Sequence, residues 1–319
     1  MPKISIITPC YNAENYIAAT IASVRAQTLI DWEHIVVDDG STDGSATVVA
    51  ALAAEEPRLR LVRQKNGGVS WARNHGFAEC APDSALLLFL DADDCLEPAL
   101  LATLADYLDA HAEVGLAYCD CRVVDSSNHV REQDHGGDFW AARFVPDGQG
   151  LRRLPPETPE TPFVSIFVLT RLIPSLAVLR RSVYQQAGGW DEAFGQPCED
   201  TDLFLRMALA APVHYVPRIL LRYRMHGGQS TTNEQHQRTQ EEKLYAKWIQ
   251  KADDAAAGSD GKRIMAEAIR FREGRFVPYL GWHYGRIRLQ KKQWLPALRF
   301  FGGALRRYCR WWLMPRVAC

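Results

Sequence analysis

The chain has 319 residues, of which 47% are hydrophobic and 24% are charged. This length suffices for one large globular domain with an appendage or for two modest domains, and the composition excludes collagen-like, low-complexity and wholly disordered proteins. The formal net charge is only −1, but every charged residue after Glu273 is basic, and there are ten of them, so residues 1–274 carry −11. This distribution favours contact between the basic C-terminal segment and an anionic surface.

The eight cysteines show neither C-x-x-C spacing nor the density of a disulfide framework, which favours free thiols in a reducing compartment. The N-terminus runs directly into an apolar segment, without the charged and long apolar regions of a signal peptide. No stretch reaches the roughly 18–20 apolar residues that span a bilayer. We therefore expect a cytoplasmic protein that at most lies on the inner face of the cytoplasmic membrane.

Short apolar segments alternate with helical patterns over the first 121 residues. The residue patterns predict strands at residues 4–8, 34–38, 59–63, 85–90 and 114–121, with helices between them, including 70–80 and one opened by Pro98. Residues 85–90 are apolar throughout, as expected of a central parallel strand that is buried on both faces. The alternation predicts a doubly wound, mostly parallel α/β sheet with helices on both faces.

The pattern changes after residue 121. Residues 125–162 hold polar, glycine-rich and proline-rich clusters, which predict a long surface excursion and favour a functional lid. Order is expected again at 163–169 and 176–179, followed by a helix at 199–210 and a strand at 213–216. We place residues 1–233 in one domain and residues 234–319 in a helical C-terminal extension, with a break at 257–259 and a basic stretch from 275.

Open α/β sheets bind ligands at the carboxyl ends of their strands. The first predicted strand is followed by Thr-Pro-Cys-Tyr-Asn at 8–12, which is neither the glycine turn of a dinucleotide-binding site nor a P-loop. The second strand is followed by Asp38 and Asp39, where a carboxylate can accept a hydrogen bond from a base edge or a ribose hydroxyl. The same Asp-Asp-Gly-Ser sequence also suits a simple turn that caps a helix.

Asp91 and Asp93 follow the central apolar strand and would lie on the same side of an extended chain. Clustered carboxylates remain ionised together when a cation lies among them, and hard oxygen donors suit Mg²⁺ or Mn²⁺, which also bind substrate phosphates. An acidic loop leading into a helix N-terminus is the plainer alternative.

Taken together and in order, these segments resemble the family 2 glycosyltransferases of GT-A fold. The resemblance rests on ISIITPCYN at 4–12, VVDDGSTDGS at 36–45, NGGVSWARN at 66–74 and FLDADD at 89–94. It continues through GGWDE at 188–192, EDTD at 199–202 and YRMH at 223–226, and so covers about residues 3–230. It implies a nucleotide-binding half at about 1–121 and an acceptor half at about 122–233.

The resemblance implies roles for nine residues. Pro9, Tyr11 and Asp39 would hold the nucleotide, with Tyr11 against the base and Asp39 accepting an imino N–H. That donor favours UDP, with dTDP or GDP as alternatives. The remaining roles are diphosphate pairing by Arg73, a ribose and metal contact by Asp91, metal ligation by Asp93 and His226, and catalysis by the general base Asp200 with its neighbour Glu199.

Each of these residues also has a plainer interpretation. Arg73 would also suit a helix surface, His226 a loop, and Glu199 and Asp200 the first turn of a helix, where acids are common. Trp190 suits either a sugar-stacking surface or the core. The tail resembles one helical-hairpin repeat. It also combines its ten basic residues with four tryptophans, Trp282, Trp294, Trp311 and Trp312. This composition suits either a helix that lies on a membrane surface or a helix that packs on the main domain.

We therefore expect an inverting glycosyltransferase that moves a sugar from a nucleotide sugar to a glycan or lipid-linked acceptor with Mn²⁺ or Mg²⁺, in cell-envelope polysaccharide or glycolipid synthesis. No nucleic-acid partner is expected. The alternatives are a nucleotide-sugar pyrophosphorylase, which would need a glycine-rich basic loop in place of residues 9–12, and a non-catalytic nucleotide-sugar-binding protein, which would not need Asp91, Asp93 and Asp200 together.

Overall fold

The computed structural model describes residues 2–131, 143–146, 151–168, 172–227 and 234–273. The chain divides into two compact units. Unit 1 comprises Met1–Ala142, Pro155–Pro162 and Arg171–Leu244, and unit 2 comprises Arg143–Leu154, Phe163–Thr170 and Tyr245–Cys319. The sequence analysis placed all of residues 1–233 in one domain, whereas in the structure two short internal segments group with the second unit.

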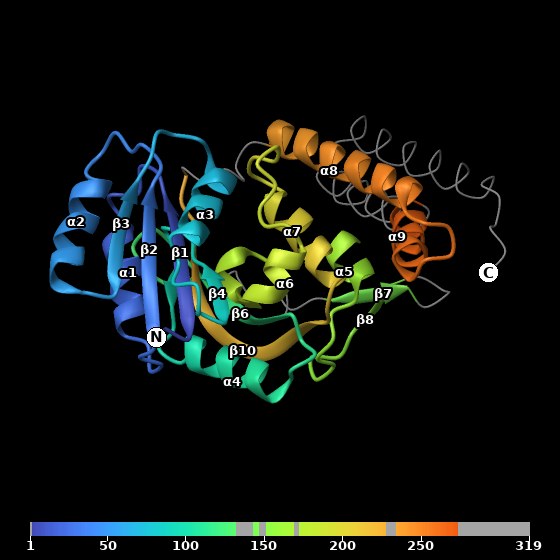
Figure 1. The fold of residues 1–319 in the computed structure, drawn as a ribbon, viewed down its shortest axis with the longest axis horizontal. Helices are drawn as coiled ribbons and strands as arrows, with labels where there is room; N and C mark the ends of the chain where they lie inside the picture. Colours follow the sequence, from blue (N-terminus) through green and yellow to red (C-terminus); the bar gives the residue numbers. More distant parts are fainter. Residues whose placement is uncertain (1, 132–142, 147–150, 169–171, 228–233, 274–319) are drawn as a thin grey trace, which may run out of the picture. The chain divides into compact units, whose positions relative to one another are not determined.

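Unit 1 is built on an eight-stranded sheet with the order β3-β2-β1-β4-β9-β6-β10-β5 (Figure 1). β9 runs antiparallel to both β4 and β6, and β5 runs antiparallel to β10, whereas the other neighbouring pairs are parallel. The predicted mostly parallel sheet is confirmed. The strands are β1 (Ile4–Cys10), β2 (Trp32–Asp38), β3 (Leu59–Arg63), β4 (Leu86–Phe89), β5 (Cys95–Leu96), β6 (Leu116–Val124), β9 (Ala177–Arg180) and β10 (Val213–Arg224).

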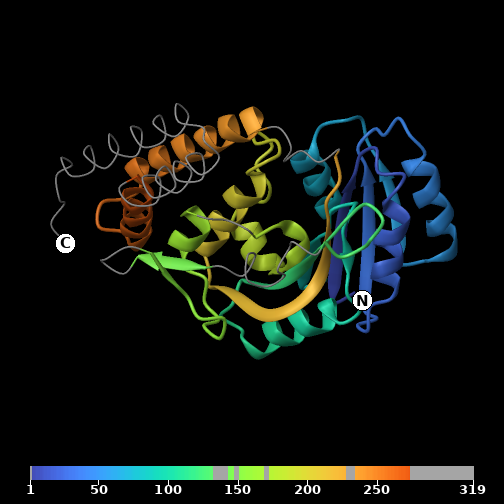
Figure 2. The ribbon, with the colours of Figure 1, turned by 180° about the vertical axis from the view of Figure 1, so that it is seen from behind.

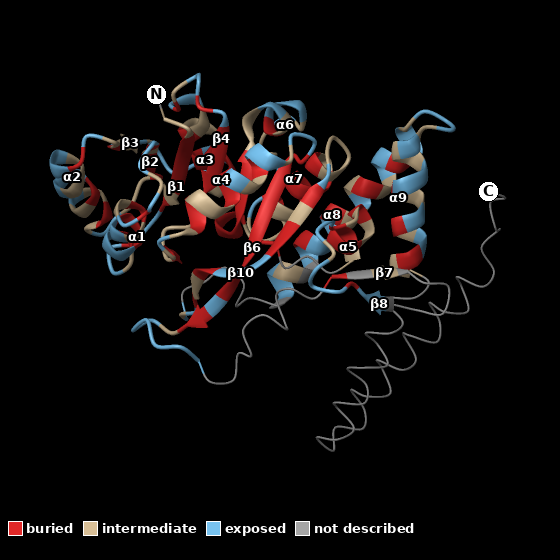
Figure 3. Cartoon of the chain, turned by 90° about the horizontal axis from the view of Figure 1, so that it is seen from below, coloured by how far each residue is buried: buried red, intermediate tan, exposed pale blue. Residues whose placement is uncertain are grey.

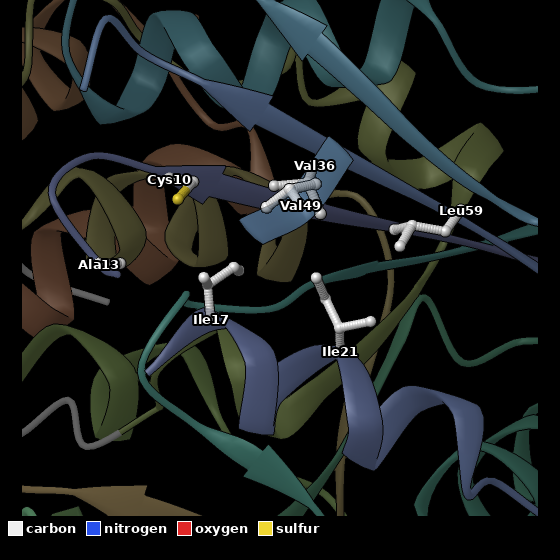
Figure 4. Close-up of a cluster of buried hydrophobic side chains, with 7 residues drawn as sticks. All are labelled: Cys10, Ala13, Ile17, Ile21, Val36, Val49 and Leu59. Atoms are coloured by element: carbon white, nitrogen blue, oxygen red, sulfur yellow. The ribbon is translucent and has the colours of Figure 1, made fainter. Parts of the chain in front are cut away.

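Helices cover both faces of the N-terminal part of this sheet. Successive side chains of a strand point to opposite faces, and β1 and β2 carry buried residues at nearly every position, so both faces need to be covered. On one face, Cys10 and Val36 pack with Ile17 and Ile21 of α1 (Ile17–Arg25) and with Val49 of α2 (Ser45–Glu55), as Figure 4 shows. The opposite face is covered by α3.

Glycine allows α3 (Val69–Ala78) to pack closely on the sheet. A Cβ at Gly76 would lie 2.4 Å from Ile7 Cγ2 and 3.0 Å from Val37 Cγ2. These two side chains alternate with Cys10 and Val36 along their strands and therefore lie on the opposite face. The close approach brings the first turn of α3 near the carboxyl ends of β1 and β2.

Strand β10 is long and curved (Figure 2). Its pairing with β6 shifts register between Tyr215 and Ile219 and again between Ile219 and Leu221, and such irregularities bend a strand. The strands β4 and β6 are buried along most of their length (Figure 3). The curvature carries the end of β10 and the following His226 to the edge where β1 and β4 end.

Two further helices of unit 1 agree with the sequence patterns to within a few residues, whereas the short helices around β9 were not predicted. The helix predicted to open at Pro98 is α4 (Leu100–Ala110), and the one predicted at 199–210 is α7 (Glu199–Ala208). The predicted strand at 213–216 is the first part of the longer β10. Short helices η1 (Pro174–Leu176) and α6 (Arg181–Gln186) flank β9.

Unit 2 contains the hairpin of β7 (Phe144–Pro146) and β8 (Leu151–Arg153), together with α5 (Phe163–Val168) and α9 (Asp260–Phe271). Helix α8 (Glu234–Asp254) begins in unit 1 and ends in unit 2. Within unit 2, the fully buried Trp248 contacts Phe163 edge to face, with ring centroids 5.4 Å apart. This contact explains why the segment around Phe163 groups with the C-terminal helices.

The helical pattern predicted from residue 234, with a break at 257–259, is confirmed up to Phe271. The basic, tryptophan-containing tail from residue 275 lies outside the described residues. Within the described ranges, none of the helices combines the length and the apolar character needed to cross a membrane.

Candidate active site

Unit 1 contains a pocket of about 590 Å³ at the carboxyl ends of β1, β2 and β4. All nine residues for which the sequence analysis proposed roles line it, although they come from six separate segments of the chain. They are Pro9, Tyr11, Asp39, Arg73, Asp91, Asp93, Glu199, Asp200 and His226. The structure therefore brings the predicted residues together, at the edge of the sheet where an α/β protein binds its ligands.

The rim of the pocket is formed by the segments that follow β1 and β2. Asn12 adopts a left-handed conformation with φ of 52° and joins the two segments, because its Oδ1 accepts a hydrogen bond from Thr42 N at 2.8 Å and its N–H donates to Ser41 Oγ at 3.0 Å. Between these anchors Tyr11 remains 53% exposed. An exposed aromatic ring on a fixed loop is available to stack against a planar ligand.

Asp39 organises the loop that leads into α3. Its Oδ1 accepts hydrogen bonds from Gln64 Nε2 at 2.7 Å and Gly67 N at 2.8 Å, and its Oδ2 accepts one from Gly68 N at 2.9 Å. The side chain is buried, with 3% of Asp39 exposed. The carboxylate of Asp39, which we expected to contact a nucleotide base, therefore fixes the Gly67–Gly68 turn.

Arg73 differs most from its expected role. We expected a guanidinium directed at diphosphate oxygens, but Arg73 is fully buried. Its Nη2 lies 2.7 Å from Asp91 Oδ1 and its Nη1 lies 2.9 Å from Glu199 Oε1. The guanidinium thus bridges two carboxylates of the pocket, and the plainer interpretation as a helix-surface arginine is wrong.

Asp93 and His226 meet on the other side of Asp91. His226 Nε2 lies 2.9 Å from Asp93 Oδ2, and the His226 ring stacks on Tyr16 with centroids 4.6 Å apart. Burial, together with the negative charge of Asp91, raises the pKa of Asp93. The neighbouring Asp94 is fully buried, and its Oδ1 accepts a hydrogen bond from Arg224 N at 3.1 Å, so Asp94 supports the loop from within the protein.

The donor types at this edge fit a divalent cation. Asp91 and Asp93 supply hard oxygen atoms and His226 an imidazole nitrogen, a set that suits Mn²⁺ and, through its oxygens, Mg²⁺. Burial, and then the negative charge of Asp91, raise the pKa of Asp93, and a cation bound here would offset both effects. Across the described ranges, however, no group of three or more His, Cys, Asp and Glu side chains converges on one point in the manner of a preformed metal site.

Asp200 lies in the first turn of α7, directly after Glu199. Its Oδ1 accepts hydrogen bonds from the backbone N–H of Thr201 at 2.6 Å and from Thr201 Oγ1 at 3.2 Å. Burial, and then the negative charge of Glu199, raise the pKa of Asp200 to about 7. A carboxylate with this pKa can take a proton from a hydroxyl near neutral pH.

Three further residues complete the site, and of these the sequence analysis had singled out only Trp190, as either a sugar-stacking or a core residue. Trp190 is 2% exposed, and its ring lies 4.2 Å from Arg73 Cζ, so this tryptophan belongs to the core beneath the pocket rather than to a sugar-binding surface. Asn74 anchors the same turn by donating to Trp190 O and accepting from Trp190 N. Ser175 Oγ accepts from Asp91 N at 3.0 Å. These contacts join distant segments, so no local sequence pattern indicates them.

Comparison with known proteins identifies the family to which the chain belongs. A family model described as glycosyl transferase family 2 matches residues 5–188. The O-antigen biosynthesis protein RfbC of Myxococcus xanthus is 33% identical over 212 residues, which cover 66% of this chain and 15% of that protein. The chain spans less than half of the length of several of the curated relatives that it matches.

Two solved structures have similar folds. Residues 1–349 of Staphylococcus aureus TarS in complex with UDP-GlcNAc are 20% identical, with a TM-score of 0.63 over 95% of this chain and 81% of that one. The mannosyltransferase PcManGT of Pyrobaculum calidifontis in complex with GDP-Man and Mn²⁺ is 18% identical, with a TM-score of 0.61 over 97% and 87%. At these identities the likeness concerns the fold. The family match covers more than half of the sequence, so this chain belongs to glycosyltransferase family 2 and has the GT-A fold.

Proposed function

We propose that this protein transfers a sugar from a nucleotide sugar, most readily a UDP-sugar, to a hydroxyl of a glycan or lipid-linked acceptor, with inversion at the anomeric carbon. The observation that carries the proposal is the juxtaposition, in one pocket, of the carboxylates at the end of β4 with the acidic start of α7. Residues 1–121 would bind the nucleotide, and residues 122–233 would supply the acceptor side.

The nucleotide would lie over the ends of β1 and β2. Tyr11 is the exposed ring available for stacking on the base, and Pro9 lines the same wall. Asp39 Oδ2 carries one hydrogen bond, from Gly68 N, and a carboxylate oxygen accepts two, so one position remains for an imino N–H. Uracil has such a donor, which is the reason for preferring UDP.

Asp91, Asp93 and His226 would hold a divalent cation beside the diphosphate. When bound, the cation supplies Lewis-acid stabilisation of the negative charge that develops on the leaving diphosphate. The structural neighbour with GDP-Man and Mn²⁺ supports this assignment by analogy of fold.

Asp200 would act as the general base. It would take the proton of the acceptor hydroxyl while the hydroxyl oxygen attacks the anomeric carbon and the bond to the nucleotide diphosphate breaks. Because the nucleophile arrives on the face opposite the leaving group, one such step inverts the anomeric configuration. Glu199 is the second acid of this turn, and its ion pair with Arg73 fixes its orientation.

The acceptor class is proposed from the relatives. RfbC of Myxococcus xanthus is described as an O-antigen biosynthesis protein and a further relative, from Escherichia coli, as a chondroitin synthase. Both names denote polysaccharide synthesis, so we propose a cell-envelope polysaccharide or glycolipid as the product of this enzyme as well.

A donor panel tests the proposal. The purified protein is incubated with Mn²⁺ and separately with UDP-, dTDP- and GDP-linked sugars, and the nucleotide diphosphate released by slow hydrolysis is measured. The proposal predicts turnover of at least one UDP-sugar, reduced by about 10²–10⁴-fold in Asp200→Asn, since this is the usual contribution of a general base. A folded protein that turns over none of the donors contradicts it.

A further inference from the structure

The buried guanidinium of Arg73 connects two parts of the pocket that lie far apart in the sequence. Glu199, which accepts from Nη1, is 126 positions from Arg73 and begins α7. Asp91, which accepts from Nη2, follows β4. Arg73 and Glu199 are both almost completely buried, with 0% and 3% exposed. The ion pair between Arg73 and Glu199 is therefore shielded from solvent, whereas the Asp91 side chain remains 25% exposed. Loss of either partner of the buried pair would leave an uncompensated charge, which is costly.

Other contacts fix the orientation of this guanidinium. The ring of Trp190 lies 4.2 Å from Arg73 Cζ, a cation–π arrangement, and Trp190 in turn packs edge to face on Phe89 of β4 with centroids 5.1 Å apart. Arginine presents its donors in a rigid planar fork and can serve two carboxylates at once, which the single ammonium of a lysine at the same position does less well.

We propose that Arg73 is a positioning residue that holds Asp91 and, through Glu199, the start of α7 in a fixed relation, rather than a residue that binds the diphosphate. Asp200 is the next residue of α7. The guanidinium of Arg73 therefore sets the distance between Asp91, on the side of the nucleotide sugar, and the proposed base Asp200. The inference rests on the proposed function, because it uses the roles proposed above for Asp91 and Asp200. Misplacing a reacting group by about 1 Å can cost on the order of 100-fold in rate.

The first test is Arg73→Lys, which keeps the buried charge and so preserves folding better than a neutral variant. We expect kcat for donor hydrolysis to fall about 100-fold, while the Kd for UDP with Mn²⁺ stays within about threefold of wild type. Arg180→Lys is the matched control. Arg180 donates its fork to the carbonyl oxygens of Val114, Leu108 and His111, away from the pocket, so its substitution should lower the melting temperature and leave kcat unchanged.

A double-mutant cycle provides the second test. If Arg73 acts through Glu199, the losses in kcat from Arg73→Lys and Glu199→Gln overlap, and the double variant is within about twofold of the more impaired single variant. If the two losses multiply, the proposal is wrong. It is also wrong if Arg73→Lys raises the Kd for UDP tenfold or more and leaves kcat at saturating donor unchanged, because that is the behaviour of a diphosphate ligand.

The two hypotheses fail in different ways. Lack of turnover by the wild-type protein with every donor contradicts the proposed function and, with it, this inference. An active wild type in which the cycle is additive contradicts the role of Arg73 alone.

Discussion

His226 Nε2 lies 2.9 Å from Asp93 Oδ2, although the two residues are 133 positions apart in the chain. The contact depends on the curvature of β10, which ends at Arg224 and brings the following loop beside the loop after β4. Arg224 reinforces it by donating from Nε to Asp93 O at 2.9 Å. A histidine that follows the last strand of unit 1 is thus in contact with an aspartate from its N-terminal half, a contact on which the proposed cation site depends.

The first prediction concerns this pair. Asp93→Asn should remove the Mn²⁺-dependent part of UDP binding, because the carboxylate charge that balances the cation beside the diphosphate is lost. Calorimetric titration of UDP with Mn²⁺, and again with excess EDTA, measures this part directly. Asp83→Asn, an exposed aspartate that does not line the pocket, serves as the control. Equal affinity of the wild type in Mn²⁺ and EDTA would rule out the metal assignment.

The second prediction follows from the raised pKa of Asp200. Since the base must be ionised to accept a proton, kcat of the wild type should rise with pH, reach half its maximum near pH 7 and level off above. Below pH 7 the rate should fall about tenfold per pH unit. In Asp200→Asn this limb should disappear, along with about 10²–10⁴-fold of the rate.

Asp202→Asn is the control for the second prediction, because it removes an acid from the same helical turn. Asp202 is fully buried and accepts from Arg206 Nε at 2.9 Å, so its loss should lower the free energy of unfolding while the pH profile keeps its limb near pH 7. If Asp200→Asn keeps a near-normal kcat with a donor that the wild type turns over, Asp200 is not the base and only stabilises the N-terminus of the helix.

Much of this site could be predicted because the end of a strand can be recognised from a short stretch of sequence. The strand before Asp91 is a continuous apolar run, and the acids after β2 and β4 follow directly in the sequence, so their place at one sheet edge could be predicted. The insertion of β9 between β4 and β6 could not, because a four-residue strand carries no signal of its partners.

The environment of Arg73 also could not be predicted from local sequence. Whether Arg73 faces solvent, a phosphate or a carboxylate depends on where Glu199 arrives, and that is set by tertiary packing. Trp190 behaves in the same way: its Gly-Gly-Trp turn is visible in the sequence, with Gly188 and Gly189 at φ of 84° and 69°, but the direction of the indole ring is decided by Phe89 and Arg73.

The third prediction concerns the fold. Gly76→Ala should destabilise unit 1 by about 1–3 kcal/mol, because the added methyl group overlaps Ile7 and forces α3 away from the sheet. Urea denaturation measures the free energy of unfolding. Gly261→Ala, in the first turn of α9, adds a methyl group with no heavy atom within 4 Å and should be neutral or slightly stabilising. Equal stability of both variants would show that α3 does not depend on this close contact.

The fourth prediction concerns residues 275–319, which lie outside the described residues. Their ten basic residues and four tryptophans should bind anionic vesicles, with about 1 kcal/mol for each basic residue at the surface. Co-sedimentation with phosphatidylserine vesicles should therefore be strong at low salt and weak at high salt, and truncation after Gly274 should abolish it. If the folded, active full-length chain stays in the supernatant at low salt, the tail has a structural or oligomerisation role.

The anomeric configuration of the first-formed sugar tests the central claim most directly. An α-linked UDP-sugar that the wild type hydrolyses is followed by proton NMR in D₂O, before the released sugar mutarotates. A single displacement by a water molecule that Asp200 activates predicts that the β-anomer forms first, with Asp200→Asn forming it about 10²–10⁴-fold more slowly. First formation of the α-anomer, or an unchanged rate in the variant, would contradict the assignment of Asp200 as the base of an inverting transferase.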